Sequence, residues 1–180
     1  MMVKQPSIVP FGYEPEKERQ GPRGTMWVYD SFADCSAQQL VRTISLAARK
    51  EMKKLVFYPL HEETLRRMGE PGATAFYRRA DELEELLENI ELPVDTVIDR
   101  WEGRRKKYTP MDTAFRFLEE KYAGPYFVYL TVDMANTVAG FDSFEFWIKK
   151  LRLCIDLKHA SSESLHPKLQ AFAHRWEAVD

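Results

Sequence analysis

The chain has 180 residues, of which 44% are hydrophobic, 13% aromatic and 30% charged, and its 26 Lys and Arg nearly balance its 28 Asp and Glu. This length fits one domain with a full core, and the aromatic content excludes a disordered chain because it supplies apolar area to bury. The formal net charge of −2 provides no broad positive field. We therefore expect neither a general nucleic-acid binder nor a protein that binds anionic membranes.

The ends and the cysteines of the chain indicate its compartment. The first residues lack the apolar core of a signal peptide, and no apolar run approaches the length of a membrane span. Cys35 and Cys154 lie far apart and form no disulfide or metal-binding pattern. The sequence therefore predicts a cytoplasmic protein that does not bind a membrane.

The chain divides into an arm and a domain. Residues 1–24 contain prolines and glycines that interrupt any helix or central strand, which predicts an extended N-terminal arm. Residues 25–180 alternate short apolar runs with amphipathic helical patterns. The runs predicted to be strands span 26–29, 55–58, 94–98, 126–131 and 151–157. The alternation predicts a single α/β domain with a doubly wound, mainly parallel, five-stranded sheet.

Two helix boundaries have clear sequence signals. Ser36 with Gln39 forms a capping box at the start of the helix that follows the first strand. At the end of the chain, Leu169, Phe172 and Trp176 have the spacing of a terminal helix. Ligands of such sheets bind beyond the carboxyl ends of the strands, so the residues that follow each strand are the candidates for a site.

The region from 101 to 151 resembles the nicotinate mononucleotide adenylyltransferases, within the wider nucleotidylyltransferase (HUP-type, Rossmann-like) superfamily. The residues Y-T-P-M-D-T at 108–113 are similar to the S-Y-T-x-D-T segment of that family, and T-V-D at 131–133 is similar to its G-A-D segment. Ala135, Asn136 and the stretch 142–151 are similar to its A-N-L-P-x-W-x-x-W-E-E-L segment, with a short indel.

The resemblance implies roles for several residues. It makes Asp133 a nucleotide-contacting aspartate, Thr109 a neighbour of the pyridine nucleotide and Phe144 the base-stacking aromatic residue. Ser161 and Ser162 fall where the family has I-S-S-T-x-I-R, without its arginine. Each role has a structural alternative: a turn residue for Asp133, a helix cap for Thr109 and a core residue for Phe144.

The front of the domain departs from the family's G-G-T-F-D-P-x-H-x-G-H segment. Ala33 and Ser36 stand at the positions of the two histidines. Each preorganised donor to a reacting phosphate typically contributes about 3 to 4 kcal/mol, so their replacement predicts lost or impaired adenylyl transfer. Ser36 either offers a phosphate its hydroxyl at a helix N-terminus or caps the helix only. Asp30, at the end of the first strand, either orients a ligand or solvates a turn.

The only dense basic run is 104–107. Arg104, Arg105 and Lys106 either attract the phosphates of a nucleotide or form a solvated loop. His61 lies beside two glutamates but has no partner at ligand spacing, so we predict no metal site.

The sequence leads to one hypothesis and two alternatives. The hypothesis is a nucleotide-binding protein of nucleotidylyltransferase type with impaired transfer, for which ATP with Mg is the expected cofactor if transfer survives. The first alternative is a divergent active nicotinate or nicotinamide mononucleotide adenylyltransferase that stabilises charge with Arg104, Arg105 or Lys106. The second is an oligomeric interaction protein that associates through the aromatic segment 141–147 and the arm.

Overall fold

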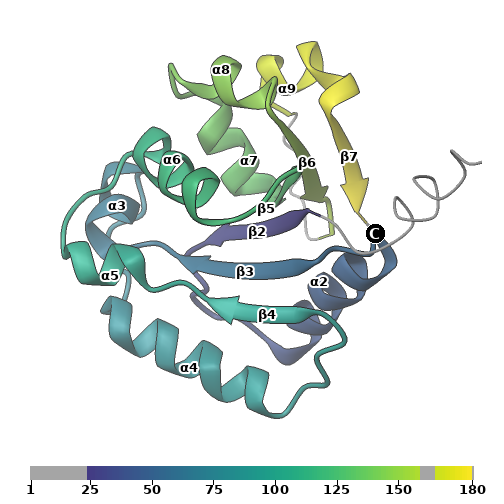
Figure 1. Cartoon of the computed structure of the whole chain (residues 1–180). Helices are drawn as coiled ribbons and strands as arrows, with labels where there is room; N and C mark the ends of the chain where they lie inside the picture. The colour runs from purple at the N-terminus through teal and green to yellow at the C-terminus, as the bar shows by residue number, and fades with distance from the viewer. Residues whose placement is uncertain (1–23, 159–164, 180) are drawn as a thin grey trace, which may run out of the picture.

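The computed structural model describes residues 24–158 and 165–179, and these residues form one six-stranded sheet between two layers of helices (Figure 1). The predicted arm up to residue 23 and the predicted site residues Ser161 and Ser162 lie outside the described residues. The strands are β2 (Thr25–Asp30), β3 (Lys54–Pro59), β4 (Asp95–Ile98), β5 (Tyr126–Thr131), β6 (Leu151–Asp156) and β7 (Trp176–Val179).

Every pair of neighbouring strands is parallel, and the order across the sheet is β4-β3-β2-β5-β6-β7. This is a Rossmann-like doubly wound order, in which successive strands first extend the sheet from β2 in one direction and then from β5 in the other. The connections after β2 and β5 therefore diverge at their carboxyl ends. A parallel α/β sheet is what the sequence predicts.

The predicted count of five strands is wrong by one. Leu169 does lie in a helix, but α9 (Pro167–Ala171) is short, Phe172 is its C-cap, and a 3₁₀ turn follows at Ala173–Arg175. Trp176 then pairs with Leu153 as the first residue of β7, not as part of a helix. A four-residue edge strand leaves too short a pattern to recognise in the sequence.

The helices divide between the two faces of the sheet (Figure 1). Apolar side chains of α2 (Ala37–Arg49) and α4 (Phe76–Glu88) pack on one face. The other face is covered by α6 (Met111–Lys121), α7 (Val132–Ala139), α8 (Phe144–Ile148) and α9. The short helices α3 (Glu62–Arg67) and α5 (Trp101–Arg105) follow the carboxyl ends of β3 and β4.

The strand β2 shows why its sequence is a continuous apolar run. Met26 and Val28 contribute to the core beneath α2 and α4, whereas Trp27 and Tyr29 contribute to the core beneath α6 to α8. All four side chains are at most 4% exposed. Both faces of a covered parallel strand are buried, so its pattern does not alternate.

The capping box at the start of α2 is confirmed. Ser36 Oγ accepts a hydrogen bond from the backbone N–H of Gln39 at 3.2 Å, and the Gln39 side chain accepts one from the backbone N–H of Ser36 at 3.3 Å.

Among the described residues, no helix is both long enough and apolar enough to cross a membrane.

Candidate functional site

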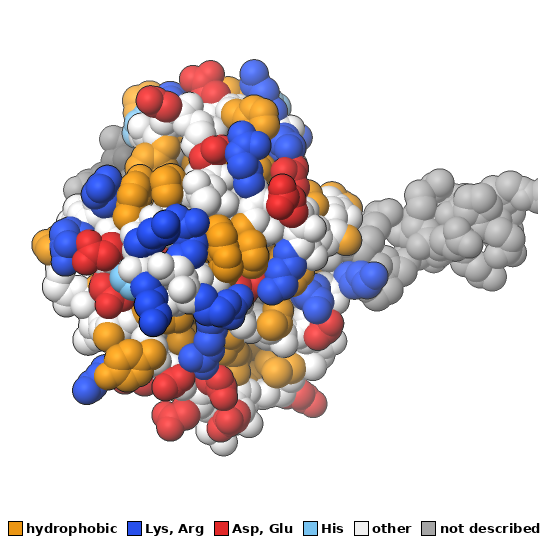
Figure 2. All heavy atoms as spheres, turned by 60° about the vertical axis from the view of Figure 1, so that its left-hand side comes forward, with side chains coloured by type: hydrophobic (Ala, Val, Ile, Leu, Met, Phe, Trp, Pro, Cys, Tyr) orange, Lys and Arg blue, Asp and Glu red, His pale blue; other side chains and the backbone are white. Residues whose placement is uncertain are grey.

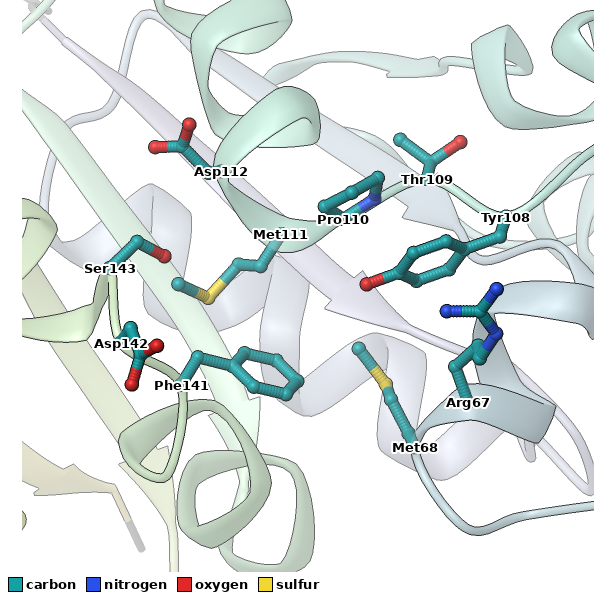
Figure 3. Close-up of a pocket in the computed structure, with 10 residues that line it drawn as sticks. All are labelled: Arg67, Met68, Tyr108, Thr109, Pro110, Met111, Asp112, Phe141, Asp142 and Ser143. Atoms are coloured by element: carbon teal, nitrogen blue, oxygen red, sulfur yellow. The ribbon is translucent and has the colours of Figure 1, made fainter.

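The larger hollow at the carboxyl edge of the sheet, which we name the α3–α6 pocket, has a volume of about 340 Å³ (Figure 3). It is lined by Arg67, Met68, Tyr108, Thr109, Pro110, Met111, Asp112, Phe141, Asp142 and Ser143. This volume lies at the lower end of the range for small-molecule sites. It fits one ligand of about the size of a mononucleotide.

Three segments that are distant in sequence form the pocket (Figure 3). The end of α3 contributes Arg67, the loop before α6 contributes Tyr108 and Thr109, and the loop after α7 contributes Phe141 and Asp142. All three segments follow β3, β4 or β5 along the chain, so the parallel sheet brings them to one edge.

One end of the pocket combines a cation with an aromatic ring. The guanidinium of Arg67 lies 4.3 Å from the centroid of the Tyr108 ring. Figure 3 shows the two side chains next to each other, with the Tyr108 hydroxyl turned toward the pocket. A guanidinium presents a planar set of donors that matches the oxygens of a phosphate or carboxylate, so this end suits an anionic group.

The opposite end is acidic and polar (Figure 3). The Asp112 carboxylate accepts hydrogen bonds from Trp147 Nε1 at 2.7 Å and from Arg116 Nε at 3.0 Å. Burial raises the pKa of Asp112, but these two bonds outweigh burial and hold it below its usual value. Asp112 is therefore an ionised acceptor, and Asp142 and Ser143 add acceptors for hydroxyl groups beside it.

Apolar side chains separate the two ends. Figure 3 shows Met68, Met111 and Phe141 between Arg67 and Asp142. A ligand with an anionic group, a flat or apolar centre and hydroxyl groups matches this sequence of surfaces.

Thr109 lines the α3–α6 pocket but is fully buried itself. Its backbone N–H donates to Thr64 Oγ1 at 2.9 Å, and its hydroxyl donates to the carbonyl oxygen of Lys107 at 3.3 Å. The alternative role as a helix cap is wrong, since α6 begins at Met111 and Pro110 takes the N-cap position without a side-chain bond.

The second hollow, which we name the switch-point crevice, has a volume of about 40 Å³ at the carboxyl ends of β2, β5 and β6. It is lined by Val28, Asp30, Phe32, Cys35, Gln39, Leu40, Thr43, Phe57, Tyr129, Thr131 and Asp156. This crevice is therefore much smaller than the α3–α6 pocket and smaller than a usual small-molecule site.

Side chains close the switch-point crevice. Phe32, at a positive φ of 61°, is buried and meets the Phe57 ring edge-on at 5.7 Å. Arg42 donates two hydrogen bonds to the Asp156 carboxylate at 2.7 and 3.2 Å, and the Tyr129 hydroxyl donates a third. Burial raises the pKa of Asp156, but these bonds outweigh burial and hold it below its usual value. The network cross-links α2, β5 and β6.

Asp30 borders this crevice at the end of β2. Burial raises the pKa of its carboxyl to about 6, partly offset by backbone hydrogen bonds from Ser31 and Phe32. Ser36 lines neither of the two hollows, and its hydroxyl serves the capping box. The structure therefore does not bring Asp30, Ser36 and Thr109 to one cavity.

Two residues singled out by the family resemblance lie away from both hollows. Asp133 is exposed in the first turn of α7. Phe144 is 3% exposed and packs edge-on against Phe172 in the core, with ring centroids 6.2 Å apart. A ligand ring cannot stack on Phe144 in this arrangement, whereas Phe141 in the preceding loop does line the α3–α6 pocket.

The basic run lies on the surface beside the pocket. Arg104 is exposed and its nearest carboxylate, Asp99, is 3.9 Å away. Arg105 packs over the Trp101 ring at 5.0 Å, and Lys106 is exposed. Figure 2 shows Lys and Arg side chains gathered in the middle of the face that comes forward from the left of Figure 1. The run adds positive charge near the pocket without lining it.

The described residues contain no cluster of three or more His, Cys, Asp or Glu that could hold a metal ion. His61 Nδ1 accepts the backbone N–H of Glu63 at 3.0 Å, and its Nε2 lies 3.6 Å from Glu62. This histidine is engaged in capping α3.

Sequence reasoning missed Arg67, Met68 and Asp142. Arg67 stands at the end of α3 and not directly after a strand. No pattern in the sequence marks such a position.

Comparison of the chain with models of known protein families finds no match, and comparison with curated proteins finds no significant one.

Proposed function

We propose that this protein binds a mononucleotide in the α3–α6 pocket and that it is a nucleotidylyltransferase-like protein whose adenylyl transfer is lost or impaired. The observation that supports this most is the polarity of the pocket, with Arg67 and Tyr108 at one end and Asp112 and Asp142 at the other. The position of the pocket at the carboxyl edge of a doubly wound sheet agrees with the general location of ligands in such folds.

The pocket suggests how the ligand lies. Arg67 would pair with the phosphate, because a guanidinium and a phosphate form parallel charge-assisted hydrogen bonds. Tyr108 and Phe141 would pack against the base. Asp142 would accept hydrogen bonds from the ribose hydroxyls, as acidic residues do in other nucleotide sites.

The candidate place for the second substrate of adenylyl transfer is narrow. Transfer requires a second nucleotide with its α-phosphate held by donors next to the first, but the switch-point crevice measures about 40 Å³. Ala33 has no donor side chain, and the Ser36 hydroxyl is occupied by the backbone of α2. These observations favour a binding protein over the divergent active adenylyltransferase.

Calorimetric titration with nicotinate mononucleotide and with AMP tests the binding proposal. Arg67→Gln should weaken binding roughly 10-fold to 100-fold, because a hydrogen bond to a charged group contributes about 1.5 to 3 kcal/mol. Arg66→Gln is the matched control, since Arg66 is exposed on the same helix and pairs with Glu63 at 2.6 Å outside the pocket. Equal loss in both variants, or no binding by the native protein, would reject the proposal.

Mass spectrometry of products after incubation with ATP, Mg and either mononucleotide separates the binding protein from the active enzyme. We expect no dinucleotide. A dinucleotide that disappears in the Asp133→Ala variant would instead establish the divergent adenylyltransferase.

One observation favours the interaction alternative. Phe146, within the aromatic segment 141–147, is 49% exposed, and the cations of Arg116 and Lys150 lie 5.7 and 5.1 Å from its ring centroid. If this surface forms an oligomer, light scattering will show a mass above one chain that Phe146→Ser reduces. A monomer in both proteins removes this alternative.

A further inference from the structure

A buried carboxyl group connects two walls of the α3–α6 pocket. Glu102, in α5, is fully buried. Its Oε1 accepts hydrogen bonds from the backbone N–H of His61 at 2.8 Å and from Thr64 Oγ1 at 2.9 Å. Thr64 Oγ1 in turn accepts the backbone N–H of Thr109 at 2.9 Å. One chain of hydrogen bonds therefore links Glu102 to α3 and to a residue that lines the pocket.

This chain fixes the position of the cation in the pocket. Thr64 and Arg67 are three residues apart in α3 and so lie on the same side of that helix. Tyr108 precedes Thr109 directly. The bridge through Thr64 thus holds the helix that bears Arg67 against the loop that bears Tyr108, and it accounts for the 4.3 Å distance between guanidinium and ring.

Several polar atoms next to Glu102 are unsatisfied. Glu102 Oε2 and the hydroxyls of Tyr29 and Tyr58 are buried without a hydrogen bond of good geometry among the described residues. The two tyrosines are register partners in β2 and β3, and their rings stack with centroids 5.7 Å apart. Buried polar atoms in native proteins almost always have partners, so a group of unsatisfied ones marks a place where charge or protons can change.

The charged and titratable groups that act on the Glu102 carboxyl come from several elements packed around it. They are Tyr29 of β2, Tyr58 of β3, Arg79 of α4 and Arg105 of α5, and the backbone N–H of His61 before α3 donates to it. Asp99 after β4 acts on Tyr58, and Tyr108 before α6 acts on Tyr29. Burial raises the pKa of Glu102 to about 7, although hydrogen bonds from His61 and Thr64, the nearby Tyr58 hydroxyl and the charge of Arg105 oppose burial. The carboxyl group therefore changes charge near neutral pH.

We propose that Glu102 is a positioning residue whose charge state sets the affinity of the α3–α6 pocket for an anionic phosphate ligand. This inference rests on the proposed function. The neutral carboxyl accepts the same two hydrogen bonds and leaves the positive potential of Arg67 intact. The carboxylate places a negative charge behind the wall that bears Arg67 and Tyr108, and it repels the phosphate. Two unit charges about 10 Å apart at an effective dielectric constant of about 20 change an affinity roughly tenfold.

The test compares the affinity for AMP between pH 5.5 and 8.5 in the native protein and in Glu102→Gln. Glutamine keeps the acceptor oxygen and mimics the neutral carboxyl. The phosphate of AMP titrates in the same range in both proteins, so the ratio of the two affinities isolates Glu102. We expect a ratio near one at pH 5.5, and at pH 8.5 we expect the variant to bind roughly tenfold more tightly. A ratio independent of pH overturns the proposal.

Thr64→Val separates the bridge from the charge. This variant keeps the carboxyl group but removes both hydrogen bonds of the Thr64 hydroxyl. We expect it to weaken AMP binding at every pH and to move the pH dependence to higher pH, because the Thr64 hydroxyl bond lowers the pKa of Glu102. Native affinity in Thr64→Val would overturn the positioning role.

A readout without ligand distinguishes failure of this inference from failure of the proposed function. The folded-state pKa of Glu102 lies above its ordinary value, so its contribution to stability falls as pH rises from about 4.5 to 7, and Glu102→Gln should remove this slope. If the slope is unchanged in the variant, the titration of Glu102 is rejected. If the slope disappears but no protein binds AMP, the proposed function fails and the linkage to an anion fails with it.

Discussion

The α3–α6 pocket and the switch-point crevice lie at the same edge of the same sheet, and each has an arginine, a tyrosine and an aspartate. In the crevice, Arg42 and Tyr129 both donate to Asp156, and about 40 Å³ remains. In the pocket, Arg67 lies over the Tyr108 ring and the acidic groups lie at the opposite end. The volume between them is about 340 Å³. In the crevice a carboxylate holds the arginine, whereas in the pocket the arginine lies over an aromatic ring and apart from the acidic groups.

The largest effect is expected from replacing Asp156, the shared hydrogen-bond acceptor in the switch-point crevice. Asp156→Ala leaves Arg42 and the Tyr129 hydroxyl without their shared carboxylate and should lower the free energy of unfolding by about 3 to 5 kcal/mol. Denaturant unfolding measures the loss, and Glu120→Ala, an exposed carboxylate on α6, is the control. Since the crevice has a structural role in this account, affinity for AMP at temperatures where the variant is folded should stay within twofold. Loss of affinity would make the crevice part of the binding site.

The next effect concerns the aromatic end of the pocket. Tyr108→Leu removes the ring beneath Arg67 and the surface for a base, and it should cost about 1 to 2 kcal/mol of binding free energy for AMP, or roughly 5-fold to 30-fold in affinity. Tyr77→Leu, on the exposed side of α4, controls for loss of a tyrosine elsewhere on the surface. An unchanged titration for Tyr108→Leu would place the ligand outside the pocket.

A smaller effect is expected from Asp30. Its pKa of about 6 lies above the ordinary value for an aspartate, so the folded protein binds more protons than the unfolded chain between about pH 4 and 6. Its contribution to stability is therefore greatest below this interval and falls as pH rises through it. Asp30→Asn should be more stable than the native protein at pH 7.5 by on the order of 1 kcal/mol, and the two should converge near pH 4. Thermal melts at the two pH values measure this difference, and a less stable variant at pH 7.5 would show that the carboxylate has a stabilising partner.

The last prediction is that restoring the two histidines of the family pattern does not restore transfer activity. Restoring the two histidines of the family pattern by Ala33→His with Ser36→His should yield no dinucleotide by mass spectrometry. The histidines would provide donors, but Phe32 and the network of Arg42, Tyr129 and Asp156 still narrow the crevice. A clear product from this double variant would show that donors, not space, limit transfer.

The sequence predicts most of the sheet, because a strand buried on both faces leaves a continuous apolar run. Met26 to Tyr29 is such a run. The capping box of Ser36 and Gln39 likewise marks the start of α2 from neighbouring residues alone. The edge strand β7 escapes prediction because it is short and follows a broken helix. Its only strong signal, Trp176, also fits the helical spacing of the residues before it.

The candidate site is predicted less well than the fold. Thr109, which the sequence predicts as a site residue from its motif, lines the pocket. Phe144 is buried in the core, whereas Phe141, three residues earlier, lines the pocket. Arg67 and Glu102 have no local signal at all. Arg67 lies at the end of α3 and Glu102 is buried in α5, so the positions of both side chains depend on how these helices pack.

A crystal structure of the protein with nicotinate mononucleotide or AMP would show where a nucleotide binds. We expect one nucleotide per chain in the α3–α6 pocket, with its phosphate on Arg67 and its ribose hydroxyls near Asp142. A nucleotide that displaces Phe32 and occupies the switch-point crevice between Asp30 and Thr131 would contradict the account.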